Sequence, residues 1–367
     1  MLATRHLLLA TVLMRAAFLT GIRQLEIREV PEPGLAGRRD VLLRVGAVGV
    51  CGSDLHYYTA GRIGSQAVAY PERVGHECAG TVMAVGDAVI ALEPGQRVAV
   101  DPLITCGLCD QCRAGRRHTC RNQSFLGSPG QAPGALAEVL VIPADCCYSI
   151  PHSMNMAEAA MVEPFSIGLY AQRLAGVASG AKLAILGAGP IGLSVLLACR
   201  TIGECRAYVT DPVDERLEAA RRCGAAWAGN PRATDVIAAI NKLEPSGVDF
   251  VFECAGQQET LDQATEILRP GGMLLIVGIP EFDRVSFPIH TLRRKELSIH
   301  NVRRQAGCTS AAIDLIASGA VRVDPLVTHH FPLAKAREAF DLVADYRDGV
   351  VKAMIHVDQA EADLADR

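Results

Sequence analysis

The feature that most constrains this chain is a run of four cysteines with two, two and seven residues between them. Four thiols at this spacing can surround one metal ion, and few other uses of cysteine need such a pattern. A tetrahedral site made of four cysteines leaves no coordination position for a substrate, so the run predicts a structural zinc site. The four residues are Cys106, Cys109, Cys112 and Cys120.

Two alternatives to zinc are open at this point. Bacterial iron–sulfur proteins share the first two gaps but then need a three-residue gap and a proline, whereas here Arg121 follows Cys120 after the seven-residue gap. The other alternative is a set of unliganded thiols. The total of thirteen cysteines is odd, so we expect a reducing compartment, the cytoplasm, rather than a disulfide framework.

Length and charge exclude several classes of function. A chain of 367 residues is long for one core, so two domains are expected. The formal net charge is −4 and no extended basic run occurs, which predicts no nucleic-acid partner. No segment approaches the roughly 20 apolar residues of a membrane span, so no membrane partner is expected. Residues 1–13 are interpreted as a disordered extension and not as a signal peptide.

The order of elements along the chain predicts an α/β protein. Short apolar runs separated by Gly and Pro, up to about Val141, indicate an all-β unit. The pattern turns helical around Met156 to Ala175. Strands and helices then alternate from Lys182 onward, which predicts a doubly wound parallel sheet with right-handed crossovers. A last strand is expected over Val351–Val357, so one domain is built from both ends of the chain. The predicted boundaries are 14–163 and 299–367 for this domain, 164–298 for an inserted nucleotide-binding domain, and about 101–121 for the four-cysteine lobe.

A glycine-rich turn carries the second chemical signal. The sequence Gly-Ala-Gly-Pro-Ile-Gly follows a predicted strand and precedes a predicted helix, which is typical of a dinucleotide-binding turn. The first glycine makes the tight turn, the second lets the backbone approach a pyrophosphate, and the third lets the helix pack closely. The helix N-terminus attracts the phosphates. The predicted cofactor-binding residues of this turn are Gly187, Gly189, Pro190, Ile191 and Gly192.

Asp211 extends the dinucleotide signal, because it lies nineteen residues after Gly192 at the end of the next predicted strand. An acidic residue there accepts hydrogen bonds from ribose hydroxyls and repels a 2′-phosphate, which predicts NAD over NADP. The alternative for Asp211 is a turn residue before Pro212. Arg216 is a further candidate for the adenine side of the site, although we expect it on a solvated helix face.

Three other residues indicate a second metal site. Cys51, His76 and Glu77 offer a thiolate, an imidazole and a carboxylate, which together suit zinc. Three protein ligands and one open position are typical of catalytic zinc. Glu163 is a fourth candidate from a distant part of the sequence. Each residue alone has an ordinary structural explanation, but their presence beside a nucleotide-binding pattern indicates an active site.

From residue 14 to residue 357 the sequence resembles the zinc-containing medium-chain dehydrogenases, and within them the sorbitol and polyol dehydrogenase branch. The resemblance implies a GroES-like β-barrel joined to a Rossmann domain, with the catalytic zinc in the cleft between them. It also implies a homo-oligomer, dimer or tetramer, and a small alcohol or polyol as substrate. It rests on the segments 51–57, 61–64, 74–77 and 163–164, the four-cysteine lobe, the glycine-rich turn and Arg304.

The branch assignment depends on Glu163, because ordinary zinc alcohol dehydrogenases have a second cysteine ligand at the matching place. The resemblance implies that Cys51, His76 and Glu77 hold the zinc, while Glu163 contacts a zinc-bound water or the substrate. Direct binding of Glu163 to the ion is left open.

The chemistry implied by the resemblance is transfer of a hydride from an alcohol carbon to nicotinamide, with zinc lowering the pKa of the coordinated alcohol. Ser53 and His56 match the proton relay of the alcohol dehydrogenases. Water held by Glu163 is the alternative route for the proton. His56 can also be a plain surface residue.

The substrate pocket is expected to differ from that of the branch. Tyr57, Phe125 and Arg304 match substrate-contact positions, and an arginine can donate several hydrogen bonds to hydroxyls. The usual aromatic residue after the arginine is Gln305 here, and the usual asparagine two positions further is Gly307. An altered pocket floor follows, so sorbitol itself is not assigned.

The leading interpretation is an NAD-dependent zinc dehydrogenase that oxidises a secondary alcohol of a polyol or similar hydroxylated metabolite to a ketone. The enzymatic alternative is a threonine-, butanediol- or galactitol-type oxidoreductase on the same scaffold. The remote alternative is a non-enzymatic, nucleotide-binding redox sensor that keeps the fold.

Overall fold

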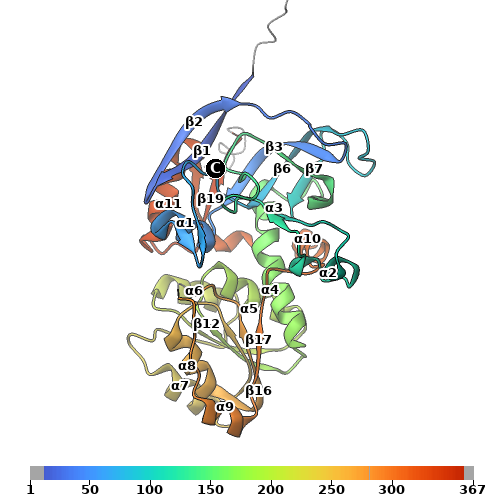
Figure 1. The fold of residues 1–367 in the computed structure, drawn as a ribbon. Helices are drawn as coiled ribbons and strands as arrows, with labels where there is room; N and C mark the ends of the chain where they lie inside the picture. The colour runs from blue at the N-terminus through green and yellow to red at the C-terminus, as the bar shows by residue number, and fades with distance from the viewer. Residues whose placement is uncertain (1–11, 281, 359–367) are drawn as a thin grey trace, which may run out of the picture.

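The computed structural model describes residues 12–280 and 282–358. Figure 1 shows two bodies, an upper one with the blue and red ends of the chain and a lower one with yellow and orange segments. Helix α4 (Val162–Ala175) lies between them. The predicted extension lies outside the described residues except for Val12 and Leu13, and β1 begins at Leu13.

The upper body is built around a seven-stranded sheet in the order β11-β7-β6-β3-β19-β18, with β10 also paired to β3. Strand β19, from the end of the chain, pairs antiparallel with β3, for example through Ile355 and Val48. The two ends of the chain therefore share one sheet. The strands are β3 (Asp40–Gly49), β6 (Glu77–Val85), β7 (Arg97–Val100), β10 (Val139–Pro143), β11 (Cys147–Ser149), β18 (Val327–Pro332) and β19 (Lys352–His356).

Smaller elements surround this sheet and carry much of the site. They include a hairpin, two short strand pairs, the helices of the four-cysteine lobe, and three longer helices. These elements are β1 (Leu13–Gly21), β2 (Gln24–Pro31), α1 (Gly52–Ala60), β4 (Arg62–Ile63), β5 (Gln66–Ala67), β8 (Leu103–Ile104), α2 (Asp110–Arg113), η1 (Arg117–Thr119), β9 (Ser124–Phe125), η2 (Ala144–Cys146), α3 (Met156–Ala160), α10 (Thr309–Ala317), η3 (Asp324–Leu326), η4 (Leu333–Lys335) and α11 (Ala336–Ala344).

The lower body is a six-stranded parallel sheet in the order β14-β13-β12-β15-β16-β17. In β12, Leu183 and Ile185 pack into a core with α4 and α5, whereas Ala184 and Leu186 pack with α7 and α8. Helices cover both faces, as a parallel sheet requires. The elements are β12 (Lys182–Leu186), α5 (Pro190–Arg200), β13 (Arg206–Thr210), α6 (Asp214–Arg222), β14 (Trp227–Gly229), α7 (Val236–Leu243), β15 (Val248–Glu253), α8 (Gln258–Ile267), β16 (Leu268–Ile276), α9 (Ile289–Lys295) and β17 (Ser298–Asn301).

The predicted fold class, a β-rich domain from both chain ends plus a doubly wound parallel sheet, is confirmed. The sheet of the inserted domain runs to Asn301, so β17 crosses the predicted boundary at residue 298. None of the helices in the described ranges combines the length and hydropathy needed to cross a bilayer.

The helical stretch that the sequence predicts around residues 156–175 is two helices. Helix α3 begins with a reciprocal pair of hydrogen bonds between Asn155 and Glu158 and ends at Ala160, with Met161 as its C-cap. Pro164 has no N–H to donate to the preceding turn, which is tolerated in the first turn of a helix and disfavours a continuous helix from α3 into α4. The break places Glu163 in the first turn of α4.

A buried carboxylate joins strands β12 and β13 of the parallel sheet to the end of α7. Glu244 is 2% exposed and accepts a hydrogen bond from Tyr208 Oη at 2.5 Å. It also forms ion pairs with Lys182 and, at 2.8 Å, with Arg206. Burial by itself would raise the pKa of Glu244, but the bonds from these three partners outweigh burial and lower it to about 2.

We predict that Glu244→Gln lowers the free energy of unfolding by about 2 kcal/mol at pH 7, because charge-assisted hydrogen bonds are lost. The folded pKa of Glu244 lies below the value of about 4.3 for an unfolded glutamate. Its stabilisation is therefore present above that pH and disappears as the pH falls toward 2. Urea unfolding at pH 7 and pH 3 measures the difference, with the exposed Glu204→Gln as control. A difference that does not shrink in acid would contradict this role.

Candidate functional site

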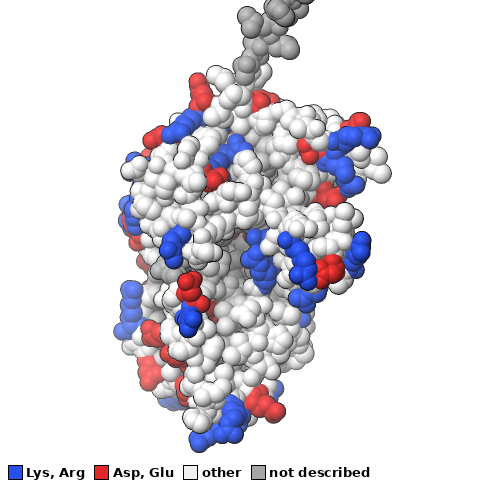
Figure 2. All heavy atoms as spheres, in the orientation of Figure 1, with Lys and Arg blue, Asp and Glu red and all other residues white. Residues whose placement is uncertain are grey.

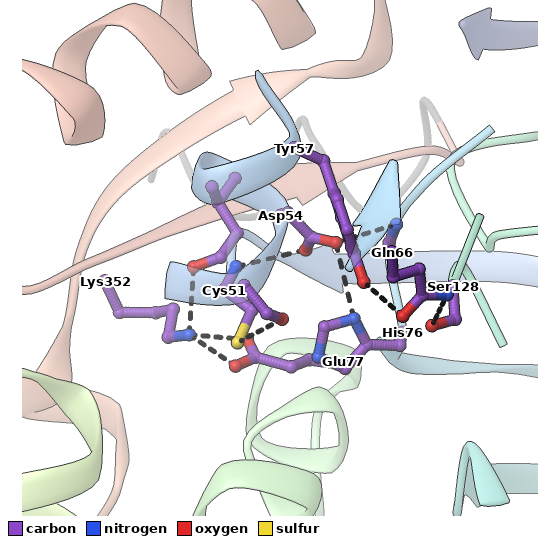
Figure 3. Close-up of polar contacts among 11 residues, drawn as sticks. Cys51, Asp54, Tyr57, Gln66, His76, Glu77, Ser128 and Lys352 are labelled. Atoms are coloured by element: carbon purple, nitrogen blue, oxygen red, sulfur yellow. Dashed lines mark hydrogen bonds and ion pairs between the residues drawn. The ribbon is translucent and has the colours of Figure 1, made fainter. Parts of the chain in front are cut away.

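Three predicted metal ligands meet at the start of α1 and β6. Cys51 is the N-cap residue of α1, His76 immediately precedes β6, and Glu77 is the first residue of β6. Each offers one ligand atom, and these atoms all lie within 4.8 Å of one another. Figure 3 shows the three side chains converging. A thiolate, an imidazole and a carboxylate at this separation fit a zinc ion with a further position for substrate.

Asp54 fixes the positions of the segments that carry Cys51 and His76. Its side chain is 1% exposed and accepts hydrogen bonds from the backbone N–H groups of Cys51 and Gly75, both at 3.3 Å. Its Oδ1 lies 3.4 Å from His76 Nδ1, which leaves Nε2 free for the ion. Burial lowers the pKa of His76, but the Asp54 carboxylate and the Cys51 sulfur together more than offset burial, so the pKa is raised.

Lys352 is a second supporting residue and comes from the far end of the chain. Its side chain is fully buried, and its Nζ donates to Glu77 Oε1 at 2.7 Å and to the carbonyl of Val50 at 3.0 Å. Burial lowers the pKa of Lys352, but the negative groups around it, Glu77 first and then Cys51 and Glu163, together outweigh burial and raise it. The ammonium group therefore compensates the carboxylate that the ligand set brings into the interior.

Glu163 lies near the ligand set but does not join it. Among the described residues, the group whose ligand atoms all lie within 4.8 Å of one another contains Cys51, His76 and Glu77 only. Glu163 is 7% exposed, and its Oε2 is buried without a hydrogen-bond partner. Burial, opposed by His76 and reinforced by Glu77, raises the pKa of Glu163 to about 7. A carboxyl group with this pKa exchanges protons at neutral pH.

The two predicted relay residues lie on one side of α1. Ser53 Oγ donates to Cys51 Sγ at 3.4 Å, so this hydroxyl touches a ligand. His56 is half-buried and lies three residues further along the helix, a spacing that makes the two side chains neighbours.

The three predicted substrate-contact residues are brought together beside His76. The ring of Phe125 lies 5.2 Å from the ring of His76, and the guanidinium carbon of Arg304 lies 3.8 Å from the centre of the Phe125 ring. Tyr57 is buried, and its hydroxyl donates to Gln66 Oε1 at 3.3 Å. An aromatic wall with one cationic end therefore adjoins the ligand set.

Gln305 points away from this wall. Its amide nitrogen donates to Asp101 Oδ2 at 2.6 Å, its amide oxygen accepts from the backbone N–H of Cys308 at 2.8 Å, and the side chain is 7% exposed. Gln305, which replaces the usual aromatic side chain, thus stabilises the start of helix α10 instead of lining the pocket.

The four cysteines of the lobe also converge, since their sulfur atoms lie within 4.8 Å of one another. The backbone N–H groups of Leu108 and Cys109 lower the pKa of the Cys106 thiol to about 6. This shift favours the thiolate form that a metal ion needs. The lobe is separate from the Cys51 set, so the structure holds two distinct candidate metal sites.

The glycine-rich turn has the geometry of a dinucleotide site. Gly187 has a φ of +107°, which disfavours any side chain. A Cβ on Gly192 would lie 1.8 Å from the Gly187 carbonyl oxygen, so the helix packs directly on the turn. A Cβ on Gly189 would meet only Arg216, at 3.8 Å, so the second glycine leaves an open approach to the N-terminus of α5. Pro190 and Ile191 begin that helix.

Asp211 has the structural role that was the alternative to cofactor binding, because its side chain stabilises the turn before α6. Its Oδ2 accepts from the N–H of Ala188 at 2.8 Å, and its Oδ1 accepts from the N–H of Val213 at 2.9 Å. Each carboxylate oxygen has a second lone pair. The turn role and a bond to a ribose hydroxyl are therefore compatible.

The expectation that Arg216 lies on a solvated helix face is wrong. The side chain is 8% exposed, its Nε donates to the carbonyl of Val350 at 3.0 Å, and its guanidinium lies 4.9 Å from the ring of Tyr346. These contacts join α6 to the segment before β19. The sequence pattern missed them because the partners lie about 130 positions away in the chain.

Comparisons with known proteins agree with this geometry. Residues 37–152 match the alcohol dehydrogenase GroES-like domain, and residues 190–318 match the zinc-binding dehydrogenase family. A sorbitol dehydrogenase of Bacillus subtilis (strain 168) is 37% identical over 94% of this chain and 97% of its own length. An L-idonate 5-dehydrogenase of Vitis vinifera is 36% identical over 90% and 91%. A protein of Sinorhizobium meliloti 1021, described as a zinc-binding dehydrogenase and solved bound to NADP, has a TM-score of 0.86 at 31% identity, with 94% and 100% covered.

The chain therefore belongs to the zinc-binding alcohol dehydrogenase family. Its relatives act on alcohols and polyols, so it is an oxidoreductase of the zinc-type alcohol and polyol class. The predicted family and reaction class are confirmed.

The sequence missed two supporting residues, Asp54 and Lys352. A signal existed for Lys352, because a lysine inside the apolar run Val-Lys-Ala-Met-Ile is a buried cation that needs a partner. Asp54 stood inside the motif that carries Cys51, but its partners at Gly75 and His76 become visible only once the loops meet.

We predict that Lys352→Met lowers the free energy of unfolding of the metal-free protein by about 3 kcal/mol, because the buried Glu77 carboxylate loses its counter-charge. Added zinc restores positive charge at Glu77, so zinc raises the melting temperature of the variant more than that of the wild type. Calorimetric melting with and without zinc checks this, with the exposed Lys335→Met as control. An equal loss in both states would contradict the role assigned to Lys352.

Proposed function

We propose that this protein oxidises a secondary alcohol of a hydroxylated metabolite to a ketone with NAD, at a zinc ion held by Cys51, His76 and Glu77. The observation that supports this most is the meeting of these three side chains, with an organising Asp54, beside an aromatic and cationic pocket. When bound, zinc acts as a Lewis acid toward the alcohol oxygen and nicotinamide accepts the hydride.

The chain itself supplies proton movement and orientation. Glu163, buried and with a pKa of about 7, is the group that takes up the alcohol proton, directly or through water. Ser53 and His56 provide a second route along the surface of α1. Phe125 and Arg304 form the wall that fixes the substrate, and its hydroxyls are held by the guanidinium donors.

Asp211 favours NAD over NADP. Its carboxylate is buried beside the turn of Gly187, where a 2′-phosphate would meet its negative charge. The S. meliloti structure contains NADP and an E. coli CFT073 relative was solved with NADH, so both cofactors occur among similar proteins, and Asp211 is the residue of this chain that favours NAD.

The relatives leave the charge of the substrate open, because one is named for neutral sorbitol and the other for the acid idonate. A homo-oligomer and a cytoplasmic location are also proposed. All thirteen cysteines are free thiols, which supports a reducing compartment.

The experiment that tests the function combines metal analysis with a substrate screen. Mass spectrometry is expected to find two zinc ions per chain, and an NADH-absorbance assay is expected to show oxidation of polyols with NAD and little with NADP. A chain without zinc at the Cys51 set, or activity confined to monohydric alcohols or amino acids, would reject the proposal.

The two metal sites should respond differently to substitution. We predict that Glu163→Gln lowers kcat by about 100-fold, because a proton acceptor is lost, while the Kd for NADH changes less than twofold. Cys106→Ser instead lowers the melting temperature, since a closed zinc site contributes folding energy. Steady-state kinetics, NADH binding by fluorescence, and calorimetry distinguish these effects. Full turnover in Glu163→Gln, or a stable but inactive Cys106→Ser, would overturn the division between the sites.

A further inference from the structure

The pocket beside the ligand set contains a cation whose charge is not neutralised by an ion pair. Arg304 is half-buried, and its Nη1 donates to the neutral amide oxygen of Gln123 at 3.0 Å. Its guanidinium group stacks on the ring of Phe125. Among the described residues, no ion pair to Arg304 within 4.0 Å is found. Burial and the neighbouring charge of Arg303 lower the pKa of Arg304 to about 10, although the charges of Glu163 and Asp101 act in the opposite direction. The net shift shows the cost of desolvating this charge.

Lys352, the fully buried cation near the ligand set, has its charge compensated by an ion pair. Lys352 is paired with Glu77 at 2.7 Å, as a charge removed from water requires. Arg304 has four further N–H donors besides the one that Gln123 accepts, and a guanidinium presents them in a fork that matches a carboxylate or phosphate. Lys352 thus has a permanent counter-ion within the chain, whereas Arg304 has none among the described residues.

The two carboxyl groups nearest to Arg304 in charge effect, those of Asp101 and Glu163, do not form an ion pair with it. Asp101 accepts hydrogen bonds from Gln305 at 2.6 Å and from the N–H of Leu103 at 3.1 Å. Glu163 forms no ion pair with Arg304 within 4.0 Å in the described part of the chain. Gln305, the departure from the branch, is the residue that holds Asp101.

Further positive charge lies next to Arg304 and on the neighbouring four-cysteine lobe. Arg303 is exposed and adjacent in sequence, and Arg116 and Arg117 of the four-cysteine lobe are exposed. Burial, and then the charges of Arg116 and Arg303, lower the pKa of His118. Figure 2 shows Lys and Arg side chains gathered along the wall of the hollow between the two bodies, over the region of α2 and α10. Such a wall attracts anions to the pocket.

We propose that the substrate carries an anionic group, a carboxylate or a phosphate, which binds the guanidinium of Arg304 while a nearby hydroxyl carbon reaches the Cys51–His76–Glu77 set. This proposal rests on the proposed function, because it names the substrate class of that same site. The order Arg304, Phe125, His76 places the charged group one aromatic ring away from the ligand set. Arg304 selects the substrate through its charge, beyond the hydrogen bonds that any polyol would accept.

The test compares three matched substrates with NAD: a hexitol, the corresponding hexonate, and the hexitol phosphate. We expect kcat/KM for at least one anion to exceed that for the hexitol tenfold or more, and the advantage to shrink as ionic strength rises. The anion with the higher kcat/KM distinguishes a carboxylate from a phosphate. In Arg304→Gln the ratio of anion to hexitol is expected to fall at least tenfold, and Arg304→Lys is expected to keep part of it.

The control is Arg38→Gln, which removes an exposed arginine paired with Asp87 and should leave the ratio unchanged. Calorimetric titration of the hexonate and the hexitol phosphate into the protein without NAD provides a readout independent of turnover. We expect saturable binding that Arg304→Gln weakens at least tenfold, at an unchanged melting temperature.

The outcomes separate this inference from the function it rests on. Oxidation of the hexitol as efficiently as both anions, with an unchanged ratio in Arg304→Gln, would overturn the anionic substrate and leave the dehydrogenase assignment standing. If no alcohol is oxidised, the proposed function fails and calorimetry alone decides the anion site. If neither anion shows binding that Arg304→Gln weakens, the anion site is rejected as well.

Discussion

The rest of the structure depends on the buried ion pair between Glu77 and Lys352. The two residues lie 275 positions apart, and their contact requires β19 to be docked beside β3 and β6 in one sheet. A carboxylate in this interior position needs a counter-charge, and the chain provides it only when both ends have folded together. The candidate catalytic zinc site is therefore a product of the whole upper domain, and the loop at Gly75–Glu77 cannot form it alone.

Sequence patterns predicted the parts of the protein that are encoded locally. The strand–turn–helix at Gly187 and the cysteine spacing of the lobe each lie within a few residues, so spacing was sufficient to find them. Side-chain directions depended on distant partners. Arg216 turned inward because Val350 and Tyr346 dock against α6, and Gln305 turned toward Asp101. The break at Met161 was missed because helical periodicity continues across it.

The charged groups of the site are of two kinds, those paired with an opposite charge and one that is not. At the ligand set, Asp54 and Lys352 fix the positions and charge of the residues that would hold the ion. Next to the ligand set, Arg304 has an aromatic ring and an amide as partners, so its charge is available to a bound substrate. The paired residues Asp54 and Lys352 hold the metal ligands in fixed positions. Arg304 has no ion pair in the described part of the chain, so its charge can contribute to substrate selectivity.

Arg216 stands at a junction whose importance for redesign is easily overlooked. It faces the second glycine of the nucleotide turn on one side and holds the carbonyl of Val350, two residues before Lys352, on the other. A substitution of Arg216 made to change coenzyme preference would also remove its hydrogen bond to Val350, which joins the inserted domain to the segment before β19. Cofactor engineering in this scaffold thus cannot be separated from the alignment of the halves.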